Sequence, residues 1–172
     1  KTRNGEYKRS CHDGCTRIPL AFGGPGFQGG GRVRELVSLI DVAPTLLDAC
    51  GLPVPPEMLG RSVLPLTRGA RAGWPEEVFI QISEAGVARA VRTHRWKYCI
   101  TAPDDATAQT TASSDHYVES HLYDLLADPY ELNNVLGLSS HRQVAEILRA
   151  RLLRRMAEAG EPVPAIDVAP ER

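Results

Sequence analysis

The chain has 172 residues, 42% of them hydrophobic and 24% charged, which is enough length and apolar content for a globular core. It carries 20 Lys and Arg against 21 Asp and Glu, so no excess of positive charge is available to hold a nucleic-acid backbone. No apolar run approaches the length of a membrane span, and we expect neither a nucleic-acid nor a membrane partner. Because the sequence opens at Lys1 inside a polar segment, we expect a fragment of a longer protein.

The first third of the chain predicts two buried strands and a helix. The apolar runs at residues 18–22 and 36–40 favour strands, and the glycine-rich segment 23–31 between them favours a loop. A helix is expected to begin at Asp41, a residue type preferred at the N-cap, and to end at Gly51.

A connection rich in Pro, Gly and Arg, residues 51–76, leads into a segment with a two-residue hydrophobic period. That period is typical of strands with one buried face. We predict four strands of one antiparallel sheet, at residues 78–82, 87–92, 96–100 and 121–125. The polar segment 102–114 predicts a mobile loop.

The last predicted element is an amphipathic helix at residues 140–159. Ser140 and Gln143 have the spacing of a capping box, in which each side chain bonds a backbone N–H at the helix start. One apolar stripe follows at helical spacing and consists of Val144, Ile147, Leu148, Leu152 and Met156. The chain thus divides into an α/β part, residues 1–70, and an α+β part, residues 71–172.

The four cysteines allow three disulfide pairings, and their spacing selects none of them. Cys50 lies in an apolar helical segment and Cys99 in a predicted strand, so we expect both thiols to be buried and inert. Two groups of metal-ligand residue types occur, Cys11-His12-Asp13 with Cys15, and Asp115-His116 with Glu119 and His121. Neither has the paired spacing of a zinc site, so we predict no metal ligands and read the second group as a polar loop entering a strand.

Several segments, taken in order, resemble the sulfatase family. Lys8 precedes Arg17-Ile18-Pro19 by the nine positions that separate a lysine from an Arg-Val/Ile-Pro strand entry in that family. The resemblance continues through residues 24–26, 36–47, 51–53, 59–62, 64–66, 122–125 and 128–134. It therefore spans nearly the whole chain.

This resemblance implies an α/β fold, the C-terminal fragment of an alkaline-phosphatase-like sulfatase. Residues 1–70 would form the edge of the main catalytic sheet, and residues 71–172 an α+β subdomain with a small antiparallel sheet and one long helix. In the family, a Cys or Ser in a Cys/Ser-x-Pro/Ala-x-Arg motif becomes the nucleophilic formylglycine, and aspartates with an Asp/Asn-His pair hold calcium. No cysteine here has that context, so we expect the formylglycine and the calcium ligands upstream, in the missing N-terminal portion of the same enzyme.

By family match, Lys8 is the predicted catalytic lysine, which binds the sulfate and offsets its developing charge. Without the match it would be read as a solvated lysine. His12 is predicted to be catalytic and substrate-binding, since imidazole has a suitable pKa for proton transfer to a leaving alcohol. Many family members carry an aromatic residue there, so a packing role is the alternative. Asp13 is predicted to be a substrate-binding or orienting carboxylate.

We predict that the intact enzyme hydrolyses sulfate esters of a sulfated small molecule or polysaccharide, and that this fragment alone is inactive. Two alternatives stay open: a phosphonate or phosphate-ester hydrolase of the same superfamily, and a non-catalytic interaction module. The family resemblance fits a periplasmic or secreted location. We also expect low stability of the isolated chain, because the strands at 18–22 and 36–40 would lack sheet neighbours.

Overall fold

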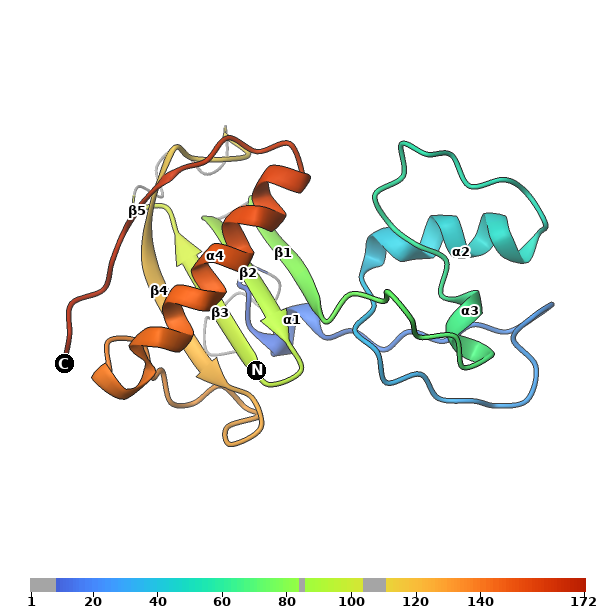
Figure 1. Ribbon diagram of the computed structural model, residues 1–172, viewed down its shortest axis with the longest axis horizontal. Coiled ribbons are helices and arrows are strands. Elements are labelled where there is room, and N and C mark those ends of the chain that lie inside the picture. Colours follow the sequence, from blue (N-terminus) through green and yellow to red (C-terminus); the bar gives the residue numbers. More distant parts are fainter. Residues whose placement is uncertain (1–8, 84–85, 104–110) are drawn as a thin grey trace. The chain divides into compact units, whose positions relative to one another are not determined.

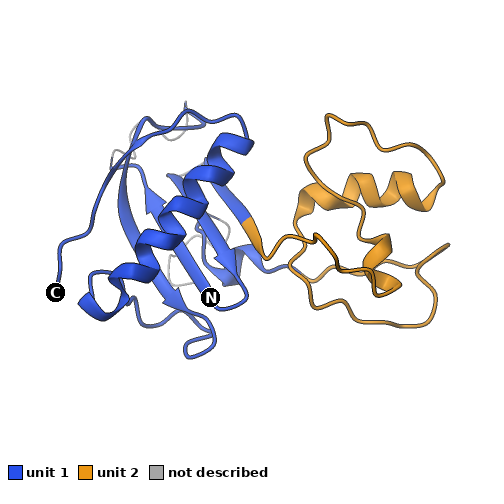
Figure 2. Cartoon of the chain, in the orientation of Figure 1, with its two compact units in different colours: residues 1–18, 79–172 blue, residues 19–78 orange. Residues whose placement is uncertain are grey.

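The computed structural model describes residues 9–83, 86–103 and 111–172 (Figure 1). The chain forms two compact units (Figure 2). Residues 1–18 and 79–172 make up the first, called the sheet unit here, and residues 19–78 make up the second, called the helical unit. The prediction that residues 1–70 form the edge of a catalytic domain concerns a longer protein and stays a prediction.

The sheet unit is built on five strands that lie side by side in chain order. They are β1 (Glu77–Ser83), β2 (Val87–Thr93), β3 (Trp96–Thr101), β4 (His116–Asp124) and β5 (Ala165–Asp167). β3 pairs antiparallel with both β2 and β4, whereas β5 pairs parallel with β4. The predicted small sheet is confirmed. β5 was not predicted, because a strand of three residues shows no hydrophobic period in the sequence.

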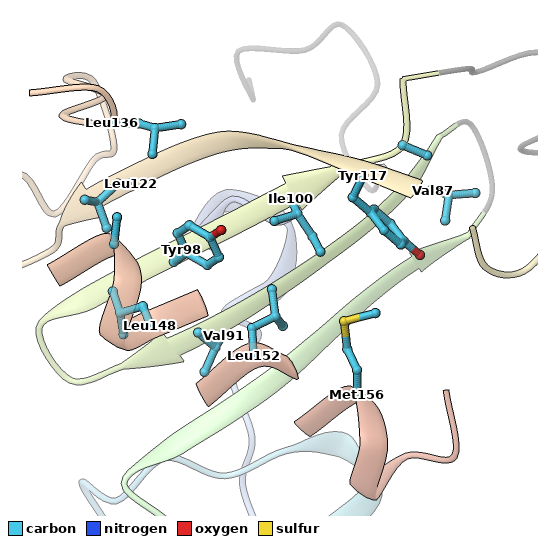
Figure 3. Packing of buried hydrophobic residues seen from close by; sticks show 12 residues of the cluster. Val87, Val91, Tyr98, Ile100, Tyr117, Leu122, Leu136, Leu148, Leu152 and Met156 are labelled. Atoms are coloured by element: carbon cyan, nitrogen blue, oxygen red, sulfur yellow. The ribbon is translucent and has the colours of Figure 1, made fainter. Parts of the chain in front are cut away.

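The last helix, α4 (Arg142–Glu158), packs on one face of this sheet (Figures 1 and 3). Its side chains Leu148 and Leu152 point toward Val91 and Tyr98 on the strands, and Met156 lies toward Tyr117 (Figure 3). Burial of such a side chain contributes about 1.5–3 kcal/mol. The predicted apolar stripe is confirmed except at Ile147, which is exposed.

Two details of the predicted sheet unit are wrong. Residues 116–121 form the first two thirds of β4, not a loop, because alternate side chains such as Tyr117 and Glu119 are buried there. The predicted capping box is absent, because the helix begins after a 3-10 turn, η3 (Ser139–His141), with His141 as the N-cap. The hydroxyl of Ser140 instead lies 2.9 Å from Nδ1 of His141.

The helical unit contains η1 (Leu39–Asp41), α2 (Val42–Ala49) and α3 (Leu64–Thr67). Hydrogen bonds hold the start of α2: the Asp41 carboxylate accepts from the backbone N–H of Ser38 and of Arg61, both at 2.8 Å. Thr45 donates its hydroxyl to the Asp41 carbonyl at 2.5 Å and accepts from the N–H of Val63 at 2.9 Å. Asp41 occupies the N-cap position as predicted, although its carboxylate bonds the N–H groups of Ser38 and Arg61 and not an N–H of α2.

A close backbone approach fixes the loop that passes this helix. A Cβ at Gly60 would lie 2.0 Å from the carbonyl oxygen of Ile40, a distance that no side chain tolerates. Only glycine therefore fits at this position.

The two strands predicted at residues 18–22 and 36–40 are wrong. Both segments are irregular or 3-10 in the structure, and Ile18, Leu39 and Ile40 are each more than half exposed. A strand needs a neighbouring strand for its backbone N–H and C=O groups, and no described segment pairs with either of these as a strand. Apolar content alone therefore did not make them strands.

All four cysteines are free. Cys99 is buried, as expected, whereas the expected burial of Cys50 is wrong: it directly follows α2 and is exposed. Cys11 and Cys99 belong to a small apolar cluster that includes Ala90.

Candidate functional site

The candidate site is built on the short helix α1 (Asp13–Thr16), which belongs to the sheet unit. His12 is its N-cap residue, and the His12 carbonyl accepts the backbone N–H of Cys15 at 2.8 Å and of Thr16 at 3.0 Å. Lys8, the predicted catalytic lysine, lies outside the described residues.

Alternation along the strands divides the sheet unit into two faces. Val91, Tyr98 and Leu122 pack under α4, so their sequence neighbours point to the opposite face. On that opposite face, Cys11 packs against Ala90 and Cys99. The segment that carries His12 therefore lies on the face of the sheet away from α4.

The imidazole of His12 has a hydroxyl within hydrogen-bond distance of each ring nitrogen. Its Nδ1 lies 3.1 Å from Oγ of Ser10, and its Nε2 lies 3.2 Å from Oη of Tyr123. The ring of His121 meets it edge-on, with 5.3 Å between centroids, and is itself stacked on Tyr123 at 5.6 Å. A half-buried imidazole between two hydroxyls can both accept and donate a proton.

The carboxylate of Asp13 is held by two cations. Arg92 donates through Nε to Oδ1 at 3.2 Å and through Nη2 to Oδ2 at 3.1 Å, and Lys97 Nζ lies 2.5 Å from Oδ1. Burial on its own would raise the pKa of Asp13, but the hydrogen bonds from Arg92 and then Lys97 outweigh it and hold that pKa below its usual value. Asp13 is therefore ionised at neutral pH and paired inside the protein.

Lys97 is fully buried and has a second acid partner, Glu131, whose side chain is 3% exposed. Its Nζ lies 2.6 Å from Oε1 of Glu131, although among the described residues no donor is aligned with Oε1 well enough for a hydrogen bond. This contact is an ion pair. The other oxygen, Oε2, accepts the backbone N–H of Asp13 at 2.7 Å. The formal charges of Asp13, Glu131, Arg92 and Lys97 cancel, as a buried cluster requires.

The backbone at Glu131 is unusual. Its φ of 55° is left-handed, and Glu131 is the one non-glycine residue with a positive φ in the part of the chain that the structure describes. Such a conformation costs on the order of 1–3 kcal/mol and persists where the surroundings determine it strongly. Here the surroundings are the ion pair and the hydrogen bond to the Asp13 N–H.

The residues around His12 come from distant parts of the chain, and the sequence revealed only some of them. His12 and Asp13 are neighbours in the sequence and were predicted. Tyr123, Arg92 and Lys97, together with Glu131, were missed. A lysine inside the apolar strand 96–100 is a signal for a buried acid partner, although it does not say which acid.

The described residues do not form a calcium site. They contain no group of three or more His, Cys, Asp or Glu side chains arranged to hold a metal ion. The carboxylates of Asp13 and Glu131 are already paired with cations. No helix in the described ranges is long and apolar enough to cross a membrane.

The chain is similar to curated sulfatases over most of its length. Residues 5–158 match the family described as N-sulphoglucosamine sulphohydrolase, C-terminal. Arylsulfatase K of Gallus gallus is 35% identical over 139 residues, which are 75% of this chain and 24% of that protein. Arylsulfatase K of Homo sapiens is 32% identical over the same shares. The extracellular sulfatase SULF-1 homolog of Drosophila melanogaster is 44% identical over 71 residues, 39% of this chain and 6% of that protein.

Solved structures give the same result for the fold. A putative sulfatase from Bacteroides thetaiotaomicron superposes with a TM-score of 0.72 at 26% identity, covering 91% of this chain and 34% of that one. A protein solved in complex with its substrate D-glucosamine-2-N,6-O-disulfate has a TM-score of 0.59 at 23% identity, covering 70% and 24%. The chain thus spans about a quarter of the length of the curated relatives it matches (24%). With well over half of its residues matched by the family description, it belongs to the sulfatase family and corresponds to the C-terminal region of that fold.

Proposed function

We propose that the protein to which this chain belongs hydrolyses sulfate esters, and that the chain contributes Lys8 and His12 to the site. The observation that carries this proposal is the family match over residues 5–158. Since the chain spans 24% of its relatives, the activity belongs to the longer protein, and we propose that the formylglycine and calcium lie in the remainder. The intact enzyme is proposed to be periplasmic or secreted, on family resemblance alone.

We propose a sulfated carbohydrate or other sulfated small molecule as the substrate. The disulfated glucosamine bound by one structural neighbour supports this class. As the S–O bond of a sulfate ester breaks, negative charge grows on the leaving oxygen. A lysine ammonium at the position of Lys8 would offset that charge.

His12 is proposed to supply the proton that the leaving alcohol oxygen needs. Its support is the orientation of the ring: the two ring nitrogens lie within hydrogen-bond distance of the hydroxyls of Ser10 and Tyr123, and donation to the leaving oxygen requires one of these contacts to open when substrate binds. Asp13 is proposed to orient this segment, since its carboxylate is already engaged by Arg92 and Lys97.

The test is a comparison of esters in the complete protein. Purified full-length enzyme is assayed on 4-nitrophenyl sulfate, 4-nitrophenyl phosphate and a phosphonate monoester. We expect sulfate release to dominate, and Lys8→Ala to lower kcat/KM by about 10²–10³-fold. Arg32→Ala, which removes an exposed cation of the same chain, is the matched control and should leave kcat/KM unchanged.

Two outcomes would replace this proposal. Preference for the phosphate or phosphonate ester would identify a phosphate- or phosphonate-ester hydrolase of the same superfamily. Absence of hydrolysis of all three esters by the fully folded protein, with calcium supplied and the formylglycine verified by mass spectrometry, would favour a non-catalytic interaction module.

A further inference from the structure

A row of three side chains crosses the sheet beneath His12. In the strand register Arg92 on β2 pairs with Lys97 on β3, and Lys97 pairs with Tyr123 on β4. Cross-strand partners point to the same face of a sheet, so these three residues form one row on the face that carries α1. We call it the Arg92–Lys97–Tyr123 row.

Every member of this row contacts His12 or Asp13. Tyr123 Oη lies 3.2 Å from Nε2 of His12, while Lys97 and Arg92 bind the Asp13 carboxylate. Neighbouring positions of one rigid sheet thus hold the imidazole ring and the next residue's side chain at once. The His12–Asp13 segment can therefore move little relative to Tyr123, the partner of the His12 ring.

Glu131 completes the attachment by holding the backbone. Its Oε2 accepts the N–H of Asp13 at 2.7 Å, and its Oε1 is paired with Lys97 at 2.6 Å. The peptide group that links His12 to Asp13 is therefore connected through one carboxylate to the middle of the row. The left-handed φ of 55° at Glu131 is a further sign that Glu131 is held in one conformation.

Lys97 itself is not available to a substrate. Its side chain is 0% exposed and lies against two carboxylates, so it cannot present its charge to a sulfate group. An apolar attachment also exists beside it, where Cys11 packs on Ala90 and Cys99. The charged network therefore adds something that apolar packing alone does not, namely a fixed direction for the His12 segment.

We propose that Lys97 and Glu131, assisted by Arg92, are positioning residues that set the orientation of the His12 imidazole for proton transfer. This inference rests on the proposed sulfate-ester hydrolysis. These residues act through Asp13 and the backbone of His12, and they do not touch the substrate. Losing one of them keeps the His12 side chain but removes a contact that sets its direction.

The experiment compares two buried ion pairs in the complete enzyme. Glu131→Gln keeps the shape of the side chain and removes the charge that pairs with Lys97. We expect kcat/KM for a sulfate ester to fall by about 10–100-fold, mainly in kcat, with a shifted pH profile. The matched control is Glu161→Gln, which removes a carboxylate 2.8 Å from the buried guanidinium of Arg89, a residue on the face of β2 that Val91 shares and that lies opposite the His12 segment. Both variants should lower the thermal midpoint, and only Glu131→Gln should change kcat and the pH profile.

A milder variant and a second readout cover the case in which Glu131→Gln does not fold. Arg92→Lys keeps the positive charge beside Asp13 but loses the two-pronged contact, and kcat should fall a few-fold, by roughly 3–10-fold. In nuclear magnetic resonance spectra of the complete protein, the His12 ring signals and their titration should shift in both network variants and stay unchanged in Glu161→Gln.

The outcomes separate the two proposals. Unchanged kcat, pH profile and His12 signals in folded Glu131→Gln or Arg92→Lys overturn the positioning role, as does an equal loss of kcat in Glu161→Gln. If the wild-type protein releases no sulfate from any ester, the proposed function fails. The His12 ring signals then still decide whether the network orients the ring.

Discussion

The two units of this chain differ in the interactions that hold their helices and strands in place. In the sheet unit each of the central strands has a neighbour on both sides, and α4 covers one face with buried side chains such as Leu152. In the helical unit, hydrogen bonds around Asp41 and Thr45 hold the short helices, while Leu39, Leu46 and Leu59 are each more than half exposed. The predicted strands formed where a neighbouring strand lies among the described residues, and did not form at 18–22 and 36–40, where none does.

The largest loss of stability is expected in the sheet unit, at Lys97 in the centre of the charge network. Lys97→Ala leaves Asp13 and Glu131 buried side by side, with only Arg92 to balance them. We expect a loss of about 3–5 kcal/mol in the free energy of unfolding of the sheet unit, measured by denaturant titration of the complete protein. Arg95→Ala removes a cation from the exposed pair with Asp124 and is the control. A change in Lys97→Ala no larger than in this control would contradict the account.

The apolar core should respond nearly as strongly. Leu152→Ala creates a cavity at a side chain with 0% exposure and should destabilise the sheet unit by about 2–5 kcal/mol. Ile147→Ala lies on the same helix at 50% exposure and should change the free energy of unfolding far less. Equal losses in a denaturant titration would mean that α4 does not pack as Figure 3 shows.

In the helical unit the corresponding loss should come from hydrogen bonds. Thr45→Val removes the hydroxyl that bonds the Asp41 carbonyl and the Val63 N–H but keeps the side-chain volume. With the Val63 N–H left without its acceptor, we expect about 1–3 kcal/mol of local destabilisation. Faster amide hydrogen exchange in α2 and α3, with unchanged exchange in α4, is the expected readout. Unchanged exchange in α2 would contradict this part of the account.

The smallest expected effect is on the stability of the sheet unit at acidic pH. Because the folded-state pKa of Asp13 lies below its ordinary value, this carboxylate stabilises the sheet unit above the unfolded pKa, about 3.9, and that contribution is lost as the pH falls through the folded pKa. Asp13→Asn should flatten this part of the stability curve, followed by thermal unfolding between about pH 5 and pH 2. A slope equal to that of the wild type would show that the Asp13 pairing does not contribute.

Local patterns predicted the sheet unit well because they depend on near neighbours. The alternation at 87–92 and 96–100 and the stripe on α4 need only a period and a partner nearby, and both are confirmed. The start of α4 was missed by two residues, since a 3-10 turn takes the place of the predicted capping box. The strands predicted at 18–22 and 36–40 failed for the opposite reason, because a strand depends on a partner that no local pattern reveals.

The candidate site was predictable only in part. His12 and Asp13 follow from the family resemblance, whereas their partners depend on tertiary structure. Tyr123 lies 111 residues from His12 in the sequence, and Lys97 lies 84 from Asp13. Residue type gave one usable signal, a lysine in an apolar strand. Its two acid partners required the strand register and the left-handed turn at Glu131.

The central claim, that His12 supplies a proton to the leaving group of a sulfate ester, has one direct test. In the complete enzyme, kcat/KM of wild type and His12→Gln is measured on a sugar sulfate, whose alcohol needs a proton to leave, and on 4-nitrophenyl sulfate, whose phenolate does not. The account predicts a loss of about 10²–10⁴-fold on the sugar sulfate and only a few-fold on the nitrophenyl ester. Equal losses on both substrates would contradict a proton-donating role and leave His12 as a packing residue.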